Sequence, residues 1–507
     1  MRRLLSTLAL LACLTPPALS ACGDDDKVAT PLDAGLAYLP EGAPFAVAID
    51  TDLDGDQYKA IDSILAKFPL EVTSVKELLR QELAGAGSGV DFEQDIEPIL
   101  GKPFVVGAID GSFIRSSTTS DFVAAIQVEH EAALEHLLEK SHSRKTGEVA
   151  GATEYEQRGS VFAVDDDVVV FAGSKELLDQ PLERADCDDH LDSATFEEAL
   201  DGLPDSAAAR VYADMEALLA GEPGAMGARR VKWIGALRTL GMTASADEDE
   251  VELQMNVRTD PEGLSDEDLP IAAGDEAPPV LAHDGEIGFG IRDAAHMIDF
   301  AEATAQALNP NGFGEYQQAK QTLDARLDIS IDDDLFGQLT GDVSASVALD
   351  GSFGVRAEVE DPARLERTLA KIADVLPGFA EGAGLGRVMI QKPSGGEGFY
   401  TLAQPDGDGV VFGVSDGVLV VASDEGRARE LADEDPEAVD GAEGAVTMSA
   451  DAEQLANAVV DKFGDQLGVS GFEALGAQLF TGPLQDMSGW MSASTEGLRG
   501  RFAVGIE

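Results

Sequence analysis

The two halves of the sequence carry the same short motifs in the same order, and this repetition limits what the chain can fold into. An ordered series of matches is the signature of an architecture that is present twice. Three pairs illustrate the series: FAVAI at 45–49 with IGFGI at 287–291, DGSF at 110–113 with DGSF at 350–353, and VFAVDDDVVVFAG at 161–173 with VFGVSDGVLVVAS at 411–423. We therefore expect two similar modules.

The boundaries of the modules follow from changes in composition. Residues 1–21 are predicted to be a leader, and residues 22–36 an acidic tether with many small residues. Module 1 is expected at 37–260 and module 2 at 277–507. The intervening residues 261–276 contain Pro and acidic residues without hydrophobic periodicity, which indicates a linker.

Alternating apolar and polar residues predict strands within each module. Apolar residues occupy every second position of 251–257, which is typical of a strand with one buried and one solvated face. Residues 343–349 follow the same pattern, with Ser344 and Ser346 between apolar neighbours. We expect these two serines to face solvent.

Two polar turns, at 165–167 and 415–417, each separate two apolar runs and predict a β-hairpin. The runs that follow, at 168–171 and 418–421, show no polar alternation, so both faces of those strands should be covered. Regular alternation of strand and helix, which a doubly wound fold needs, is absent. The expected fold class is α+β, with two similar modules that each contain a mainly antiparallel sheet with helices packed on one face.

The N-terminus has the pattern of a secretory signal. Two arginines precede a short apolar stretch that two prolines interrupt, and the stretch is too short to form a stable spanning helix. It ends in Leu19-Ser20-Ala21-Cys22, which resembles the lipobox of bacterial lipoproteins. The resemblance implies that the thiol of Cys22 is lipidated and that the chain is cut just before it. An ordinary signal peptide cleaved near Ala21 is the alternative.

The cysteines are consistent with this interpretation. Cys13 lies in the leader and Cys22 is the predicted anchor, so Cys187 is expected to be alone in the mature chain, without an intramolecular disulfide. We therefore expect an extracytoplasmic protein that a lipid on Cys22 attaches to the cell membrane.

The charge of the chain restricts its partners. Asp and Glu total 95 and Lys and Arg total 35, which gives a net charge of −60. Such a field repels phosphate backbones, so a nucleic-acid partner is excluded. It also repels anionic lipid headgroups, so the expected membrane contact is the lipid anchor rather than the protein surface.

One acidic loop could hold a metal ion. Asp50, Asp52, Asp54 and Asp56 precede or flank a glycine as in the start of an EF-hand loop. Ile61 occupies the position where that loop needs a bidentate Glu, so we expect at most a weak Ca²⁺ site and otherwise no cofactor. The alternative is a strand-to-helix turn in which Asp54 or Asp56 caps the helix.

Two long segments resemble an exported bacterial lipoprotein family that is known only as a domain of unknown function. They are LPEGAPFAVAIDTDLDGDQ at 39–57 and QLTGDVSASVALDGSFGVRAEVEDP at 338–362. The resemblance would cover nearly all of the mature chain. It implies export and brings no known activity.

No pattern of a catalytic nucleophile or of a phosphate-binding loop is present in the sequence. We therefore expect a protein that is not an enzyme and that acts by binding or scaffolding. A carrier of a lipid or another apolar ligand is an alternative, but it would need an apolar cavity, and the solvated strand faces expected at 252–258 and 344–346 argue against it. A metal-dependent enzyme centred on Asp50, Asp52 and Asp54 is the remaining alternative.

Overall fold

The structure is a computed structural model that describes residues 30–507 except 71, 86–88, 111–121, 158, 186, 188, 221–224, 282–284, 383–387, 394–397, 404–408 and 468–480. The chain divides into two compact units. The first contains residues 1–226 and 237–259, and the second contains 227–236 and 260–507. Residues 227–236 thus group with the second unit, although they precede the last two strands of the first.

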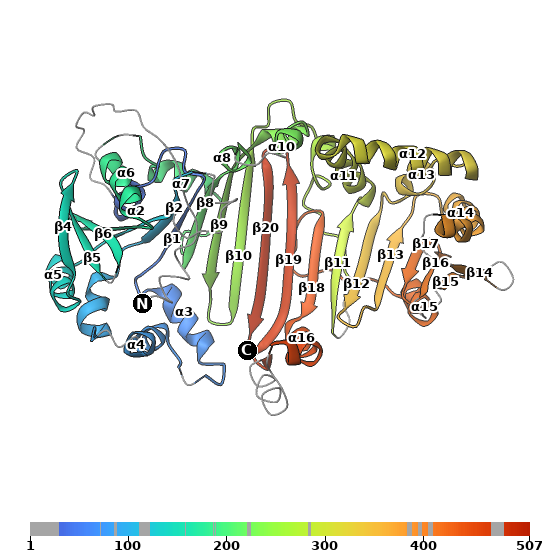
Figure 1. The fold of residues 1–507 in the computed structure, drawn as a ribbon. Helices are drawn as coiled ribbons and strands as arrows, with labels where there is room; N and C mark the ends of the chain where they lie inside the picture. Colours follow the sequence, from blue (N-terminus) through green and yellow to red (C-terminus); the bar gives the residue numbers. More distant parts are fainter. Residues whose placement is uncertain are drawn as a thin grey trace. The chain divides into compact units, whose positions relative to one another are not determined.

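The first unit is built on an antiparallel sheet with the strand order β4-β5-β6-β7-β3-β2-β1-β8-β9-β10 (Figure 1). Its strands are β1 (Phe45–Ile49), β2 (Phe104–Ala108), β3 (Phe122–Gln127), β4 (Arg144–Val149), β5 (Ala152–Gln157), β6 (Ser160–Asp165), β7 (Val168–Ala172), β8 (Ala209–Asp214), β9 (Leu237–Ala246) and β10 (Glu250–Thr259). Its helices include α2 (Pro31–Leu36), α3 (Asp56–Leu65), α4 (Val75–Gly85), α5 (Glu131–Lys140), α6 (Lys175–Ala185), α7 (Ser193–Ala199) and α8 (Met215–Ala220).

The second unit is built on an antiparallel sheet with the order β14-β15-β16-β17-β13-β12-β11-β18-β19-β20 (Figure 1). Its strands are β11 (Glu286–Arg292), β12 (Asp342–Ala348), β13 (Phe353–Glu358), β14 (Met389–Gln391), β15 (Tyr400–Ala403), β16 (Gly409–Ser415), β17 (Val418–Ala422), β18 (Val446–Asp451), β19 (Leu484–Ser494) and β20 (Gly497–Ile506). Its helices include α10 (Lys232–Ala236), α11 (Ala294–Leu308), α12 (Pro310–Leu327), α13 (Ile331–Asp334), α14 (Pro362–Gly382), α15 (Glu425–Asp433) and α16 (Ala452–Leu467).

The mixture of helices and antiparallel sheet confirms the predicted α+β class. Both predicted hairpins are present, because β6 pairs with β7 and β16 pairs with β17 across two-residue turns. Asp166 and Asp416 adopt positive φ angles of 48° and 49° in these turns, a conformation that Asp tolerates better than most residues. Consecutive residues of β7 and β17 are buried, as expected for strands covered on both faces.

The expectation that helices pack on only one face of each sheet is wrong. In the first unit, Leu178 and Leu182 of α6 pack on one face, while Leu134 of α5 packs on the other. In the second unit, Leu431 of α15 packs against Val420, and α14 packs on the opposite face. The physical reason lies in β7 and β17, whose uninterrupted apolar runs need cover on both sides.

A segment outside the sheet precedes the first strand of each unit, and we call these segments the first strap (residues 30–44) and the second strap (residues 269–281). Leu39 of the first strap and Leu281 of the second are 1% and 0% exposed, and both belong to a core cluster. The first strap begins with helix α2, where the side chains of Thr30 and Asp33 form a capping box. Residues 31–36, predicted as the end of the tether, are therefore part of the fold, and the second half of the predicted linker packs on the second unit.

Glycines in the sheet mark the places where the second strap approaches it. A Cβ atom at Gly288 would collide with the carbonyl oxygen of Leu281, and one at Gly290 would collide with the carbonyl oxygens of Pro278 and Pro279. Only glycine leaves room for this close approach. The motif IGFGI in β11 thus reflects the packing of the second strap.

The predicted orientation of β12 is wrong. Ser344 and Ser346 are 2% and 0% exposed, whereas Val347 is 47% exposed. The Oγ atom of Ser344 donates a hydrogen bond of 2.8 Å to the carbonyl oxygen of Pro279, and the guanidinium of Arg427 donates one of 2.8 Å to the Oγ of Ser346. The polar face is buried because the strap and α15 satisfy its hydroxyl groups. On the apolar face Val347 stays accessible, whereas Val343 is buried in a core cluster with Leu365 and Leu369 of α14.

The repeated DGSF motif can be located only in part. Asp110 follows the end of β2, and Asp350 follows the end of β12. Residues 111–113 lie outside the described residues. Among the helices that the structure describes, none combines the length and the apolar character that crossing a membrane requires.

Candidate functional site

The sheet of the first unit has an apolar face that is only partly covered. Hydrogen-bonded register places Val47, Val211, Met242 and Met255 in one row across β1, β8, β9 and β10. None of these four side chains is buried. At the end of β10 the exposure rises further, to 42% for Val251 and 39% for Leu253. We define the first apolar face as Val47, Val211, Leu240, Met242, Val251, Leu253, Met255 and Val257.

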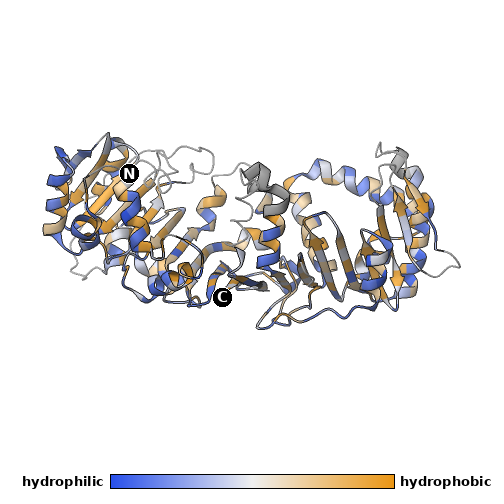
Figure 2. Ribbon diagram, turned by 90° about the horizontal axis from the view of Figure 1, so that it is seen from below, coloured by the Kyte–Doolittle hydropathy of each residue, from blue (hydrophilic) through white to orange (hydrophobic). Residues whose placement is uncertain are grey.

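The second unit has the corresponding face. Phe289, Met448, Gly489 and Phe502 lie in one row across β11, β18, β19 and β20. The three large side chains of this row are again only partly buried. We define the second apolar face as Ile287, Phe289, Met448, Met487, Met491, Phe502 and Val504. Figure 2 shows the hydrophobic residues of the strands of both sheets in orange.

Methionine is concentrated on these two faces. The chain contains 10 methionines, and Met242, Met255, Met448, Met487 and Met491 lie on the faces just defined. An unbranched, polarizable side chain adapts to partners of different shape, so exposed methionines are typical of binding surfaces that repack. The pattern therefore points to recognition through apolar contact.

The acidic loop predicted as a metal site joins β1 to α3. The Oδ1 atom of Asp50 accepts a hydrogen bond from the backbone N–H of Asp52, and the Oδ1 of Asp52 accepts one from the N–H of Asp54. Asp54 pairs with Lys76 at 2.7 Å and Asp56 with Lys59 at 3.1 Å. Lysines thus compensate two of the four carboxylates, and these two do not converge on a common position where a metal ion could bind.

The alternative expectation for this loop also needs correction. Gly55 is the residue that precedes α3, and no side chain caps the helix there. Asp54 and Asp56 are therefore not the cap. In the part of the chain that the structure describes, no group of three or more His, Cys, Asp or Glu side chains is arranged to hold a metal ion.

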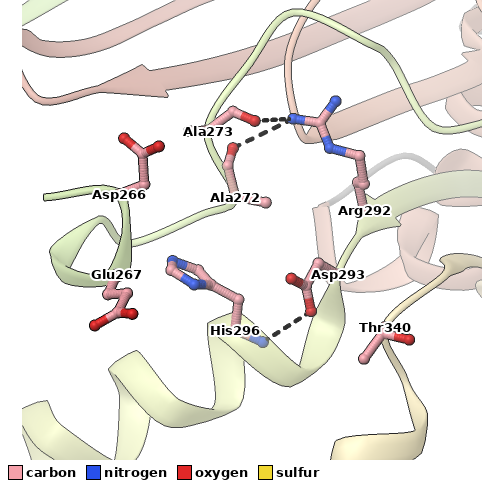
Figure 3. A pocket seen from close by; sticks show the side chains of 8 residues that line it. All are labelled: Asp266, Glu267, Ala272, Ala273, Arg292, Asp293, His296 and Thr340. Atoms are coloured by element: carbon pink, nitrogen blue, oxygen red, sulfur yellow. Dashed lines mark hydrogen bonds between the residues drawn. The ribbon is translucent and has the colours of Figure 1, made fainter.

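A polar pocket of about 420 Å³ lies in the second unit, where the second strap passes the start of α11 (Figure 3). Its lining residues are Asp266, Glu267, Ala272, Ala273, Arg292, Asp293, His296 and Thr340. The guanidinium of Arg292 donates to the carbonyl oxygen of Ala273 at 2.6 Å, and to those of Ala272 and Gly274. The Nε2 atom of His296 lies 2.8 Å from the carbonyl oxygen of Leu269.

These contacts assign the pocket a structural role. The cationic group of Arg292 is saturated by strap carbonyls, so it is not presented to an anion. Asp293 accepts a hydrogen bond from the backbone N–H of His296 and caps α11. Near the pocket, burial raises the pKa of Asp342, and the carboxylate of Glu358 raises it further. The pocket holds the strap in place and offers no nucleophile beside a base.

A buried lysine links α11, α12 and α13. The side chain of Lys320 is 4% exposed, and its Nζ lies 2.9 Å from Glu302 and 2.7 Å from Asp332. Burial alone would lower the pKa of Lys320, but the hydrogen bonds to Asp332 and Glu302 outweigh it and raise that pKa. Burial alone would raise the pKa of Glu302, but the hydrogen bonds from Lys320 and Tyr316 lower it below its usual 4.5. The cluster is an ion network that stabilises the helices, not a reactive amine.

Cys187 is disulfide-bonded in the structure, which represents the chain with its predicted leader. The sequence analysis expected Cys187 to be alone in the mature chain, after removal of the leader and lipidation of Cys22, and that expectation stays a prediction. The other cysteines of the chain, Cys13 and Cys22, lie outside the described residues, and so does the whole predicted lipidation site.

A comparison with models of protein families shows the family to which this chain belongs. The model of one family, described as a protein of unknown function (DUF3352), matches residues 20–376. The chain belongs to this family. The predicted membership of a family of unknown function is thereby confirmed. No curated protein matches the chain.

Solved structures give a weaker comparison. Crystal form III of TP0453 is 13% identical, with a TM-score of 0.24, and the match covers 46% of this chain and 82% of that one. Crystal form I of TP0453 is 15% identical, with a TM-score of 0.26, and the match covers 46% and 80%. A similarity this low carries no argument about fold or function.

The apolar faces are the feature that the sequence analysis missed. Alternation at 251–257 and 343–349 was interpreted as one buried apolar face and one solvated polar face, and the structure reverses this for Val251, Leu253, Ser344 and Ser346. The sequence signal for these faces was methionine at alternate strand positions, with small or polar residues between. The glycines of IGFGI were a second signal, because they mark which face the strap covers.

Proposed function

We propose that this chain is a lipoprotein outside the cytoplasmic membrane that binds a partner through the apolar faces of its two units. The observation that carries the proposal is the accessibility of the first apolar face. Leaving large apolar side chains in water is unfavourable by about 25 cal/mol per Å². A contiguous exposed apolar surface on a highly charged protein is therefore typical of an interaction site.

The proposed location rests on the N-terminal sequence. Leu19-Ser20-Ala21-Cys22 follows a short apolar leader and resembles a lipobox. A single acyl chain gives only marginal membrane binding, and lipoproteins of this type therefore need more than one chain for stable attachment. The lipid would hold the folded units at the membrane without contact between the acidic surface and the headgroups.

We further propose that the two units arose by internal duplication. Each strand of the first sheet has a counterpart at the same position of the second sheet, in an identical order. Ile49 and Ile291 end the apolar part of the corresponding strands, with Leu39 and Leu281 at matching positions of the two straps. Duplication also accounts for the presence of an apolar face in each unit.

Binding is favoured over catalysis by the way in which the polar groups are used. The hydroxyls of Ser344 and Thr447 donate to strap carbonyls, and Arg292 does the same. Lys320 is held by two carboxylates. These groups stabilise the fold, so none of them is poised to attack a substrate.

A carrier of a lipid or another apolar ligand is the second candidate, and the five methionines on the apolar faces favour it. The structure weakens the earlier argument against a carrier, because Ser344 and Ser346 are buried and the polar face at 252–258 is partly buried. Mass spectrometry of lipids that copurify with the protein separates the candidates. A carrier retains a stoichiometric lipid, and a protein-binding module does not.

The proposal is tested with Nile red, a neutral dye that fluoresces in apolar surroundings. The mature chain is expected to bind the dye, and replacing Val251 and Leu253 with Thr should reduce the fluorescence while keeping the strand propensity of β10. A matched variant replaces Asp433 and Asp435, which are also exposed, with Asn. Equal fluorescence for the Thr variant and the native chain, with unchanged melting temperatures, would contradict a binding role for this face.

A further inference from the structure

The first apolar face ends in a group of carboxylates. β9 and β10 are joined by Asp247, Glu248 and Asp249, which are all exposed. This turn directly precedes the two most exposed residues of the face, Val251 and Leu253. The sheet therefore presents an apolar surface and a negative surface side by side.

The acidic loop between β1 and α3 lies at the same end of the sheet. Ile49, the last residue of β1, shares a row with Leu253 of β10 through β8 and β9. The side-chain oxygen of Gln57 accepts a hydrogen bond of 2.9 Å from the N–H of Ala246, the last residue of β9. This bond ties the first turn of α3, which follows the loop that contains Asp52, to the end of β9, which precedes the turn at 247–249.

Several of these carboxylates form no ion pair with another residue in the described part of the chain. Lys76 and Lys59 compensate Asp54 and Asp56. No ion pair is recorded within the described residues for Asp52 or for the three acids of the turn. We define the acidic end as Asp52, Asp247, Glu248 and Asp249. Its uncompensated charge attracts cations within a Debye length of about 8 Å at physiological salt.

From this juxtaposition we infer that the occupant of the first apolar face is a basic amphipathic helix of a partner protein. This inference rests on the proposed binding function and names the partner class. The apolar stripe of such a helix would cover Met242, Leu253 and Met255, and its lysines or arginines would lie against the acidic end. Charge complementarity excludes an acidic helix and steers the encounter with a basic one.

The dimensions of the face match a helix. The four strands β1, β8, β9 and β10 are spaced by about 4.8 Å, which makes the face about 14 Å wide. An α-helix with its side chains is about 10–12 Å across. The methionines of this face, Met242 and Met255, are partly buried. Accessible methionines next to acidic residues form the kind of surface that accepts amphipathic helices of varied sequence.

The test uses the complete mature chain and a synthetic helical peptide whose leucines line one face and whose lysines line the other. Titration calorimetry at physiological salt measures its binding. One control peptide has the same composition in scrambled order, and another carries Glu in place of Lys. We expect the basic amphipathic peptide to bind at least about tenfold more tightly than either control.

Three variants of the chain locate the site. Val251→Thr with Leu253→Thr should weaken peptide binding by about tenfold or more. The turn variant combines Asp247→Asn, Glu248→Gln and Asp249→Asn, and it should weaken peptide binding several-fold and reduce the salt dependence of that binding. The control variant makes an equal charge change on the second unit, with Asp433→Asn, Asp435→Asn and Asp440→Asn, and it should leave peptide binding unchanged.

The outcomes separate this inference from the function on which it rests. If Nile red binds at the face but the acidic or scrambled peptide binds as well as the basic amphipathic one, the face is a binding site and the partner class is wrong. If the Thr variant changes neither dye nor peptide binding, both proposals fail. If the two charge variants weaken peptide binding equally, the general negative charge of the protein attracts the peptide, and the acidic end has no special role.

Discussion

The Oγ atom of Ser344 donates a hydrogen bond of 2.8 Å to the carbonyl oxygen of Pro279, across the interface between β12 and the second strap. A neighbouring contact has the same form, since the hydroxyl of Thr447 donates to the carbonyl oxygen of Pro278 at 2.7 Å. These bonds determine which face of the sheet is covered. On the opposite face of β12, Val347 remains accessible at 47% exposure, whereas Val343 is buried.

Removing one strap contact should destabilise the second unit. Ser344→Ala deletes the donor and leaves the partly buried carbonyl of Pro279 without it, so we expect a loss of about 1 kcal/mol in the free energy of unfolding. Denaturant titration of the mature chain measures this loss. Val347→Thr, on the same strand but facing solvent, is the matched control and should change stability by less than about 0.5 kcal/mol. The reverse ranking of the two variants would refute the assignment of the faces.

The Lys320 network should make stability depend on pH. The pKa of Glu302 is lowered in the folded state, so its contribution is present above its unfolded value near 4.5 and is lost as the pH falls through the folded value. Lys320→Met should remove this contribution and cost about 2 kcal/mol at pH 7, because Glu302 is then left partly buried without a cation. The cost should shrink at pH 3. A cost that is the same at both pH values would mean that packing, not charge, explains the effect.

Calcium should have little effect on stability. Asp54 and Asp56 are paired with lysines, and Asp50 and Asp52 accept backbone hydrogen bonds within the loop. We therefore expect the change on adding calcium to be well under the roughly 2.7 kcal/mol that a ligand at 100 times its dissociation constant provides. Calorimetry with calcium and with a chelator measures it. A large calcium-dependent rise in melting temperature that Asp52→Ala abolishes would make this loop a metal site.

Cys22→Ser should release the protein from membranes. The lipobox ends at Cys22, and without its thiol no thioether to a lipid can form. Fractionation of cells that produce the native and variant chains gives the distribution, and mass spectrometry of the mature N-terminus gives the modification. Ser494→Ala, at an exposed position at the end of β19, serves as the control and should stay with the membrane fraction. A mature N-terminus at another residue, without an acyl chain, would exclude the lipid anchor.

Local sequence patterns predicted much of the secondary structure. The turn at 165–167 and the apolar run at 168–171 determined a hairpin and a strand that is buried on both faces, because turn chemistry and the lack of polar alternation act over a few residues. Such features need no knowledge of distant contacts.

The burial of the sheet faces could not be predicted in the same way. Ser344 is buried only because residue 279, far away in sequence, supplies an acceptor, and Val251 is exposed because no described element packs fully over it. Alternation identifies two faces but does not say which one the rest of the chain covers. The candidate site therefore emerged from the fold, and the acidic loop singled out from the sequence became its rim.

Site-directed photo-cross-linking at position 253, in intact cells, tests the central claim most directly. A photo-reactive amino acid there should give one discrete adduct, because Leu253 would lie beneath the bound partner. Adding the basic amphipathic peptide should reduce the yield of this adduct. The same probe at position 433, which is also exposed, should give no such adduct. No adduct at position 253, or adducts of equal yield at both positions, would contradict the claim that the first apolar face is the binding surface of this protein.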